Sequence, residues 1–394
     1  MTITQSFNMR TVPARIIRGG SSKGIYLDIR AMPPAGPERD ALILKVFGSP
    51  DRRQIDGLGG ADKLTSKVAV MGPPTRDDCD IDYLFGQVNT ELPRVDWAAN
   101  CGNLSAGAAL YGALTGAGRV EGDAIHVNVH QVNTGRKLVT TVPLVDGMPA
   151  IDGDFAIGGV PGTGARIDVD FGDFAGSALG GDVLPTGSPT DRFDVPGTGP
   201  LDVSVIDMAN LLYFVRAEDI GMDTAASIYD MQADTALVAR LEAVRKAVSA
   251  EIGFITGPDA DETLKVSTNP LIFAVATPRD YAATNAGQVA AGDTDIFARS
   301  LARYEFSKAY PGSGAAGSAV AVGIPGTLAH EACRDIGQAE GIYTLRVGHP
   351  GGVLEVAAEV DSSGNRVAVR KALIGRTARL LMDGTAYVRA TDRG

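Results

Sequence analysis

A short motif that occurs twice is the strongest constraint on how this chain can fold. Residues 101–109 read CGNLSAGAA and residues 311–319 read PGSGAAGSA, so the copies share Gly, Ala, Gly and Ala at equivalent positions. Each copy opens a run of small residues with helical spacing. Similar helices in the two halves of a 394-residue chain predict two related lobes that face each other across one cleft.

The first residue of the motif differs between the copies, because Cys101 opens the first and Pro311 opens the second. A thiol at a helix start lies beside unpaired backbone N–H groups and the positive end of the helix dipole, which favour a thiolate or a bound carboxylate. The pattern therefore predicts a proton-handling site in the first half. A nucleophile pair of Cys101 with a histidine stays open as an alternative, although no histidine has a recognisable partner pattern.

Composition and charge exclude several classes of function. The formal net charge of −11 disfavours nucleic acids and anionic membranes as partners, so a small anionic substrate requires cations that gather locally. Three scattered cysteines cannot form a disulfide framework, and the four histidines do not cluster with them into a metal site. The chain has no apolar run of about 18 residues and no secretory signal pattern at its start. A cytoplasmic protein without a bound metal is expected.

Alternating apolar and polar residues, which are typical of strands, dominate the chain, and helical spacing is confined chiefly to 40–47, 104–115, 235–252 and 314–322. Because many short strands accompany few helices, we expect an α+β fold. Residues 172–200 are rich in Gly, Asp, Ser and Pro and are interpreted as a connection between the halves. The predicted lobes are therefore residues 1–195 and 196–380, and the last strand, near 380–394, is a candidate to return to the first lobe.

Lys67 follows a glycine-rich loop, residues 57–66, and enters the apolar strand 67–70. A lysine at such an entry can be partly desolvated, which favours the neutral amine that acts as a base. From position alone, the commoner interpretation is a surface lysine that snorkels from a strand edge.

Other candidate ligand-binding residues have equally plain alternatives. The segment RGGSSKG at 18–24 supplies flexible backbone, two hydroxyls and a cation, but it lacks the P-loop pattern and also fits an ordinary turn. Asn210 follows a predicted strand and is common turn chemistry. Arg279 and Lys308 are the cations that the second half can offer, and each also fits a solvated surface charge.

Several motifs, taken together, resemble one enzyme family from residue 18 to about residue 379. They are RGGSSKG at 18–24, QIDGLGG at 54–60, LTSKVA at 64–69, DYLF at 82–85, NCGN at 100–103, VPGT at 160–163, IPGT at 324–327 and HPGG at 349–352. In this order they resemble the 2-methylaconitate isomerase and 4-oxalomesaconate tautomerase family of the diaminopimelate-epimerase-like superfamily. The resemblance implies two pseudo-symmetric lobes, each a curled, mostly antiparallel sheet or barrel around a central helix, with the active site between them.

The resemblance also implies roles for particular residues. Lys67 and Cys101 match the proton-transferring pair of the family, and no cofactor is required. Two-thiol epimerases of the superfamily have a second cysteine at the position of Pro311, so its loss favours an allylic proton shift over epimerisation. The implied substrate-binding residues are Ser21, Ser22, Lys23, Ser66, Asn100, Gly102, Asn103, Asn210, Arg279, Lys308, Gly312, Ser313 and Gly314.

The expected reaction is a double-bond isomerisation in an unsaturated di- or tricarboxylate such as 4-oxalomesaconate or 2-methylaconitate. Lys67 would remove a proton to form a dienolate, and Cys101 would add a proton two carbons away or stabilise the intermediate. Motifs of both subfamilies occur, so the choice of acid stays open. The alternatives are an epimerase or racemase of a small carboxylic acid and a non-catalytic carboxylate-binding protein of the same fold. A homodimer is a candidate assembly.

Overall fold

The computed structural model describes residues 9–97, 101–158, 160–284, 287–338, 341–364 and 366–390. The chain divides into two compact units: the first unit is Met1–Val169 with Arg376–Gly394, and the second unit is Asp170–Gly375. The first unit's first segment ends at Val169, which is before the boundary near residue 195 that composition suggested. Residues 172–200 are not a plain connection, because they contain the short helix η3 (Gly172–Phe174) and strand β11 (Asp191–Val195), which pairs with β12 (Gly199–Met208).

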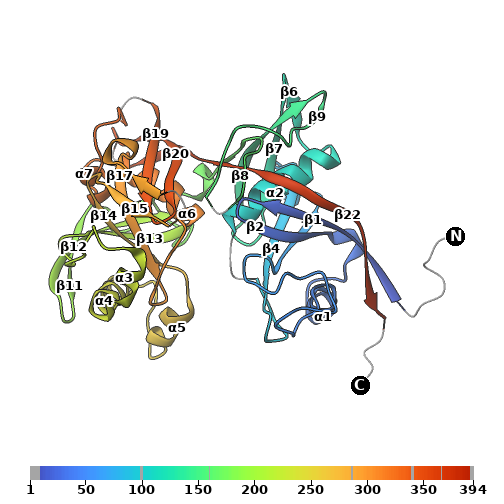
Figure 1. Ribbon diagram of the computed structural model, residues 1–394, viewed down its shortest axis with the longest axis horizontal. Helices are drawn as coiled ribbons and strands as arrows, with labels where there is room; N and C mark the ends of the chain where they lie inside the picture. The colour runs from blue at the N-terminus through green and yellow to red at the C-terminus, as the bar shows by residue number, and fades with distance from the viewer. Residues whose placement is uncertain are drawn as a thin grey trace. The chain divides into compact units, whose positions relative to one another are not determined.

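The first unit contains one mixed sheet (Figure 1). The consecutive neighbours are β22 (Ala378–Arg389), β1 (Met9–Gly19), β2 (Ser22–Asp28), β3 (Lys67–Gly72), β4 (Ile81–Val88), β7 (Ala124–Gln131) and β8 (Arg136–Val145). The pairs β2–β3 and β4–β7 are parallel and the other pairs are antiparallel. Three short strands extend this sheet: β5 (Val95–Asp96) beside β4, β6 (Arg119–Glu121) beside β7 and β9 (Met148–Pro149) beside β8.

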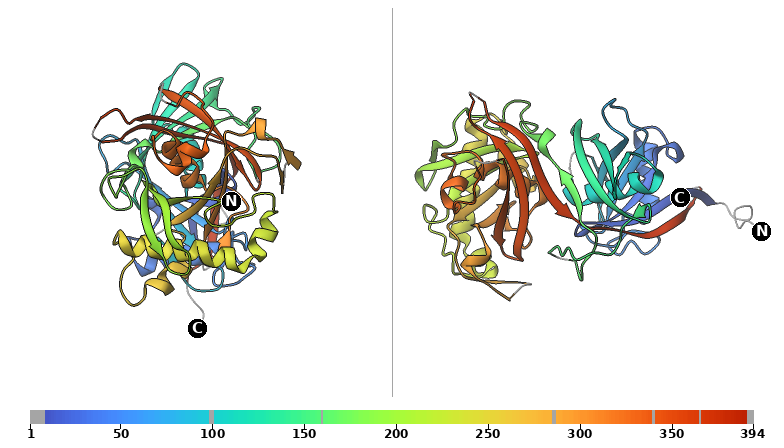
Figure 2. Two further views of the ribbon diagram at one scale, coloured as in Figure 1. Left: turned by 90° about the vertical axis from the view of Figure 1, so that its left-hand side faces the viewer. Right: turned by 90° about the horizontal axis from the view of Figure 1, so that it is seen from above.

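Two helices pack against the sheet of the first unit (Figures 1 and 2). Helix α1 (Pro37–Phe47) buries Ile43 and Phe47 in a core with Val68 of β3. Helix α2 (Gly102–Thr115) is buried from Leu104 to Gly112 and contacts β1, β7 and β8. Its small residues allow close approach, since a Cβ on Gly107 would lie 2.0 Å from the Tyr26 hydroxyl of β2. The short helix η2 (Ile29–Ala31) follows β2.

The second unit contains its own mixed sheet. The consecutive neighbours are β11, β12, β13 (Asn210–Arg216), β14 (Leu271–Ala276), β17 (Ile296–Ala302), β19 (Ile342–His349), β20 (Gly352–Asp361) and β21 (Ala368–Arg376). The pairs β13–β14 and β17–β19 are parallel. The smaller strands are β18 (Glu305–Phe306) beside β17 and the hairpin β15 (Tyr281–Ala283) with β16 (Gly287–Val289). Strand β10 (Ile167–Asp170) spans the division between the units.

Helices lie on both sides of the strands in the second unit (Figures 1 and 2). Helix α6 (Gly312–Val322) contacts β12, β13, β19 and β20, whereas α4 (Thr235–Glu251) shares a core cluster with Tyr213 and Val215 of β13. The remaining helices are α3 (Ile228–Ala233), α5 (Ala260–Val266), α7 (Leu328–Ala332) and η4 (Ala291–Asp293). The helices expected at 40–47, 104–115, 235–252 and 314–322 correspond to α1, α2, α4 and α6.

The two units have the same order of strand pairings. In the first, an antiparallel pair β1–β2 is followed by parallel β2–β3, antiparallel β3–β4 and parallel β4–β7. In the second, antiparallel β12–β13 is followed by parallel β13–β14, antiparallel β14–β17 and parallel β17–β19. The small-residue helix precedes the last parallel partner in both units. Among the described residues, none of the helices combines the length and apolar composition needed to span a bilayer.

Candidate functional site

The β1–β2 turn of the first unit lies against the start of α2. The Asn103 amide donates a hydrogen bond to the Ser21 hydroxyl at 3.2 Å. Gly20 adopts φ +53°, and a Cβ there would lie 2.3 Å from the Asn103 side-chain oxygen, so this turn requires glycine. Four of the predicted binding residues, Ser21, Ser22, Gly102 and Asn103, are therefore brought to the turn and the first turn of one helix.

Lys67 opens β3, directly beside β2 in the parallel ladder. Its side chain is only 8% exposed, and its Nζ donates to the Gln87 Oε1 at 2.7 Å. The ring centre of Phe85 lies 5.2 Å from the same nitrogen. The structure thus excludes the solvated surface lysine that position alone had favoured. Lys23 is held against the loop before Lys67, because its backbone N–H donates to the Leu64 carbonyl at 2.9 Å.

Cys101 is the N-cap residue of α2 and is 8% exposed. Its carbonyl accepts hydrogen bonds from both the backbone N–H and the hydroxyl of Ser105 at 3.3 Å. Burial raises the pKa of Tyr26 and of Tyr83 well above the usual range, and the nearby Cys101 charge adds to both shifts. The thiol therefore occupies an enclosed position at the positive end of a helix dipole.

A buried arginine lies within electrostatic reach of Cys101. Arg376 is 5% exposed; burial lowers its pKa to about 10, and the Cys101 charge opposes that shift. The next residue, Thr377, accepts a hydrogen bond from the Gly20 backbone at 2.9 Å, which anchors this strand end to the β1–β2 turn. In a chain of net charge −11, Lys23 and Arg376 supply cations in one unit, as an anionic substrate requires.

Two buried hydroxyls in this unit have no hydrogen-bond partner within the described part of the chain. They are the Ser22 Oγ, 2% exposed, and the Tyr83 Oη, fully buried. Buried polar groups without partners are rare, and a bound ligand is one way to satisfy them. Ser66, also fully buried, instead donates to Gln54 at 2.8 Å. Asn100 lies outside the described residues.

Sequence reasoning missed three residues of this arrangement, Gln87, Tyr83 and Arg376. Tyr83 belongs to the DYLF motif, but the motif does not indicate that its hydroxyl is unpartnered. Gln87 lies opposite Lys67 only through the antiparallel register of β3 with β4. Arg376 comes from the far end of the chain, and no local pattern marks it.

The second unit brings together a similar group of polar residues. The Asn210 amide donates to the Ser313 hydroxyl at 2.7 Å, next to Gly312 and Gly314 in the first turn of α6. Pro311 is the N-cap residue, at the position that Cys101 has in α2. Lys308 precedes this helix, and its Nζ lies 5.5 Å from the ring centre of Tyr229.

Arg279 lies at the other end of the same sheet. It follows β14, whereas Asn210 begins the parallel strand β13, so the length of these strands, about 20 Å for six residues, separates them. Its guanidinium donates to the Thr224 hydroxyl and to the Thr277 carbonyl. Arg279 lines a cavity of about 350 Å³ with Arg216 and Glu331. The structure does not bring it to the start of α6.

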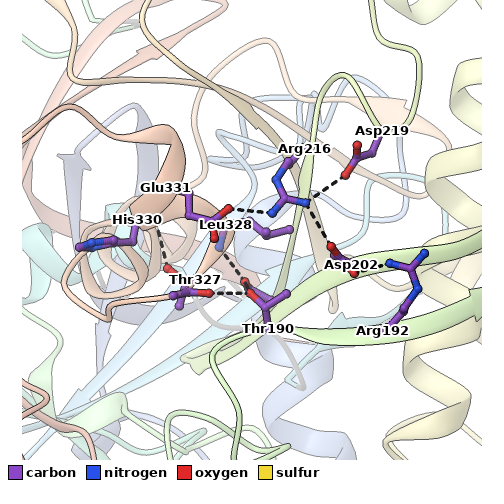
Figure 3. Close-up of polar contacts among 11 residues, drawn as sticks. Thr190, Arg192, Asp202, Arg216, Asp219, Thr327, Leu328, His330 and Glu331 are labelled. Carbon is purple, nitrogen blue, oxygen red and sulfur yellow. Dashed lines mark hydrogen bonds and ion pairs between the residues drawn. The ribbon is translucent and has the colours of Figure 1, made fainter.

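Arg216 is held by carboxylates beside that cavity (Figure 3). Its guanidinium pairs with Glu331 at 2.7 Å and with Asp202 and Asp219 at 3.3 Å each. These contacts raise the pKa of Arg216 above its usual range, with the Glu331 hydrogen bond as the largest cause. The cluster links β12, β13 and α7 and has the composition of a structural ion-pair network.

Comparison with known proteins places the whole chain in one group. The family described as PrpF protein matches residues 9–389. A 3-methylitaconate isomerase of Eubacterium barkeri is 39% identical, covering 96% of this chain and 97% of its own length. A 2-methyl-aconitate isomerase of Cupriavidus necator is 37% identical, covering 96% of this chain and 97% of its own length. A (4E)-oxalomesaconate Delta-isomerase of Novosphingobium sp. (strain KA1) is also 37% identical, covering 97% of this chain and 98% of its own length.

Solved structures agree with this grouping. The crystal structure of a methylitaconate-delta-isomerase is 38% identical, covers 97% of each chain and has a TM-score of 0.89. A hydroxyproline epimerase from Agrobacterium vitis has a TM-score of 0.52 at 10% identity, covering 98% of this chain and 94% of that one, which shows a shared fold alone. This chain and the hydroxyproline epimerase therefore have the same mixed α/β fold.

Proposed function

The chain belongs to the PrpF protein family and is an isomerase, and we propose that it moves a carbon–carbon double bond in an unsaturated di- or tricarboxylate by an allylic proton shift. One observation carries the proposal: the first unit contains a buried amine, Lys67, and a buried thiol at the N-cap position of α2, Cys101, within electrostatic reach of a buried arginine. An amine and a thiol can together perform such a shift, one taking a proton and the other giving one.

In the proposed mechanism, Lys67 as the free amine removes a proton from the carbon vinylogous to a substrate carboxylate. The C–H electrons move through the double bond and form a dienolate whose charge resides on that carboxylate. Cys101 then gives its proton to the carbon two positions away, so the double bond has moved and no atom is gained or lost. The proton on Lys67 returns to Cys101 through solvent before the next cycle.

The developing negative charge needs preorganised donors. We propose that the backbone N–H groups of Gly102 and Asn103, with Ser22 and Lys23, bind the carboxylate that becomes the dienolate. Removing one donor of this kind costs about 3–4 kcal/mol of transition-state stabilisation. The unpartnered Ser22 hydroxyl supports this assignment, since a ligand oxygen would supply the missing hydrogen bond.

We propose that the start of α6, in the second unit, is a carboxylate-binding element in its own right. Gly312, Ser313 and Gly314 begin α6 with free backbone N–H groups, and Asn210 contacts the Ser313 hydroxyl. Lys308 would add charge at the same helix end. Helix N-termini bind anions such as carboxylates through these N–H groups and the helix dipole.

The substrate class follows from the relatives, whose names refer to methylitaconate, methylaconitate and oxalomesaconate. Proton NMR of the purified enzyme in D₂O with these three acids and trans-aconitate would test the proposal. Deuterium entry at an allylic carbon together with a shifted alkene is expected for one of them. Deuterium at a single sp³ carbon with inversion would instead show an epimerase, and binding without exchange would show a carboxylate-binding protein.

A further inference from the structure

We infer that Gln87 is a positioning residue for Lys67, whose neutral side chain aims the amine without holding it as an ammonium ion. The inference rests on the proposed role of Lys67 as the base. It concerns a residue whose side chain does not need to touch the substrate. Its support comes from the hydrogen bonds of Gln87, from the order of charges across three strands, and from the surroundings of Lys67.

The hydrogen bonds of Gln87 determine which end of its amide faces Lys67. Its Nε2 donates to the Ser66 carbonyl at 2.8 Å and to the Lys63 carbonyl at 3.1 Å. Both amide hydrogens are therefore used, and a flipped side chain would place its oxygen against two carbonyl oxygens. The Oε1 must face Lys67, from which it accepts at 2.7 Å. The loop before Lys67 therefore fixes the orientation of the Gln87 amide, and this amide in turn positions the Lys67 amine.

The register places Gln87 between two charged residues of opposite sign. Lys67 lies opposite Gln87 in the β3–β4 pair, and Gln87 lies opposite Asp96 in the β4–β5 pair. Directly opposed residues share one face of a sheet, and two strand spacings separate the backbones of Lys67 and Asp96 by about 9–10 Å. Gln87 is therefore a neutral spacer that keeps the Asp96 carboxylate one strand away from the amine.

The other groups around Lys67 also leave its amine without a paired anion in the described part of the chain. Its Nζ faces the Phe85 ring, and among the described residues no carboxylate is paired with it. The cationic side chains that share this unit and the proposed site are Lys23 and Arg376, and the Cys101 thiol is the other titratable group named for the site. A carboxylate at position 87 would be the first anion in direct contact with the amine. A contact of that kind stabilises the protonated form of a lysine.

The decisive variant is Gln87→Glu, which keeps the shape and exchanges the amide for a carboxylate. We expect the acidic limb of the kcat/KM–pH profile to move to higher pH by about 1–3 units, which is a roughly 10- to 1000-fold loss at neutral pH, with recovery at high pH. Gln87→Met removes the acceptor without adding charge, so kcat should fall at every pH while the limb stays in place. A purely structural role would lower activity in both variants without moving the limb.

Asn89→Asp is the matched control, because it makes the same change of charge at an exposed amide two residues along the chain. The acidic limb of the kcat/KM–pH profile of Asn89→Asp should stay at the wild-type pH. The Nζ titration of Lys67, followed by ¹⁵N NMR of lysine-labelled protein and assigned by its loss in Lys67→Met, separates this inference from the proposed function. If Gln87→Glu leaves that titration unchanged, the inference is overturned. If the titration moves but Lys67→Met retains turnover, only the catalytic role of Lys67 fails.

Discussion

The two units share one order of strands but differ at the positions where chemistry is proposed. The first residue pair of the parallel ladder is Gly24 with Lys67 in the first unit and Leu212 with Leu271 in the second. The lysine therefore corresponds to a leucine that is 6% exposed. The same order of strands is therefore compatible with an ionisable residue, Lys67, in one unit and an apolar residue, Leu271, in the other.

The N-termini of α2 and α6 differ in the same way, because only one of them has an ionisable side chain at the N-cap. Cys101 caps α2, whereas Pro311 caps α6 and has neither an N–H nor a thiol. Yet a hydrogen bond between a strand-turn residue and the first helical turn is kept in both units, from Asn103 to Ser21 in one and from Asn210 to Ser313 in the other. The comparison teaches that the polar contact at the helix start occurs in both units, while the proposed proton-transfer residues Lys67 and Cys101 lie in the first unit.

In each unit one leucine fills the space between a strand and the small-residue helix, and a glycine makes room for it. In the first unit, Gly24 faces the Leu104 side chain, with a Cβ position 2.7 Å from Cδ2. In the second unit, Leu212 occupies the strand position and Gly317 leaves room for it, with a Cβ position 1.9 Å from Cδ1. The space between strand and helix is filled from opposite sides.

Lys67→Met makes the first unit resemble the second and should have the largest effect. Loss of a general base lowers the rate by about 10²- to 10⁴-fold, while the affinity for the substrate should be nearly unchanged. Steady-state turnover with calorimetric binding of the substrate checks both statements. Lys137→Met, at a surface pair with Asp78, is the control and should keep normal turnover. Near wild-type rates for Lys67→Met would remove this lysine from the mechanism.

Gly107→Ala and Gly317→Ala test the close packing of α2 and α6. Overpacking of this kind costs about 1–3 kcal/mol of the free energy of unfolding. Gly107→Ala should cost more, because the Tyr26 hydroxyl in its way also donates to the Leu104 carbonyl at 2.9 Å, whereas Leu212 only has to repack. Urea denaturation midpoints of both variants give the comparison. Equal losses would show that the hydrogen bond adds nothing.

Alkylation by iodoacetamide at pH 8 should distinguish Cys101 from the other two cysteines. Burial raises the pKa of Cys79 to about 11 and that of Cys333 to about 12, so less than about 1% of each is thiolate at pH 8. Cys101 instead begins α2, within electrostatic reach of the Arg376 guanidinium. Peptide mass spectrometry should therefore find Cys101 labelled about tenfold faster or more. Preferential labelling of Cys333 would contradict this order.

Ser313→Ala should have the smallest effect. It removes the hydroxyl that Asn210 contacts but keeps the backbone N–H groups of α6. A single hydrogen bond contributes about 0.5–1.5 kcal/mol, so KM should rise about two- to tenfold while kcat is nearly kept. Steady-state kinetics measure this split. A fall in kcat with an unchanged KM would place Ser313 in the chemical step instead of in binding.

Local patterns in the sequence determined the helices, the repeat and the family motifs. Small-residue runs with helical spacing predict α2 and α6, because helix formation depends on neighbours three and four residues apart. The contrast between Cys101 and Pro311 is visible in the printed sequence. Even the proton-transferring pair could be proposed, through motifs that lie around Lys67 and Cys101.

Only the tertiary structure decided which distant residues meet. Gln87 reaches Lys67 through strand register, and Arg376 reaches the surroundings of Cys101 because β22 returns the end of the chain to β1. The cation Arg279, a plausible substrate contact from its charge alone, lies at the far end of its sheet. Register and chain return depend on the burial of whole faces and not on neighbouring residues, so no local pattern records them.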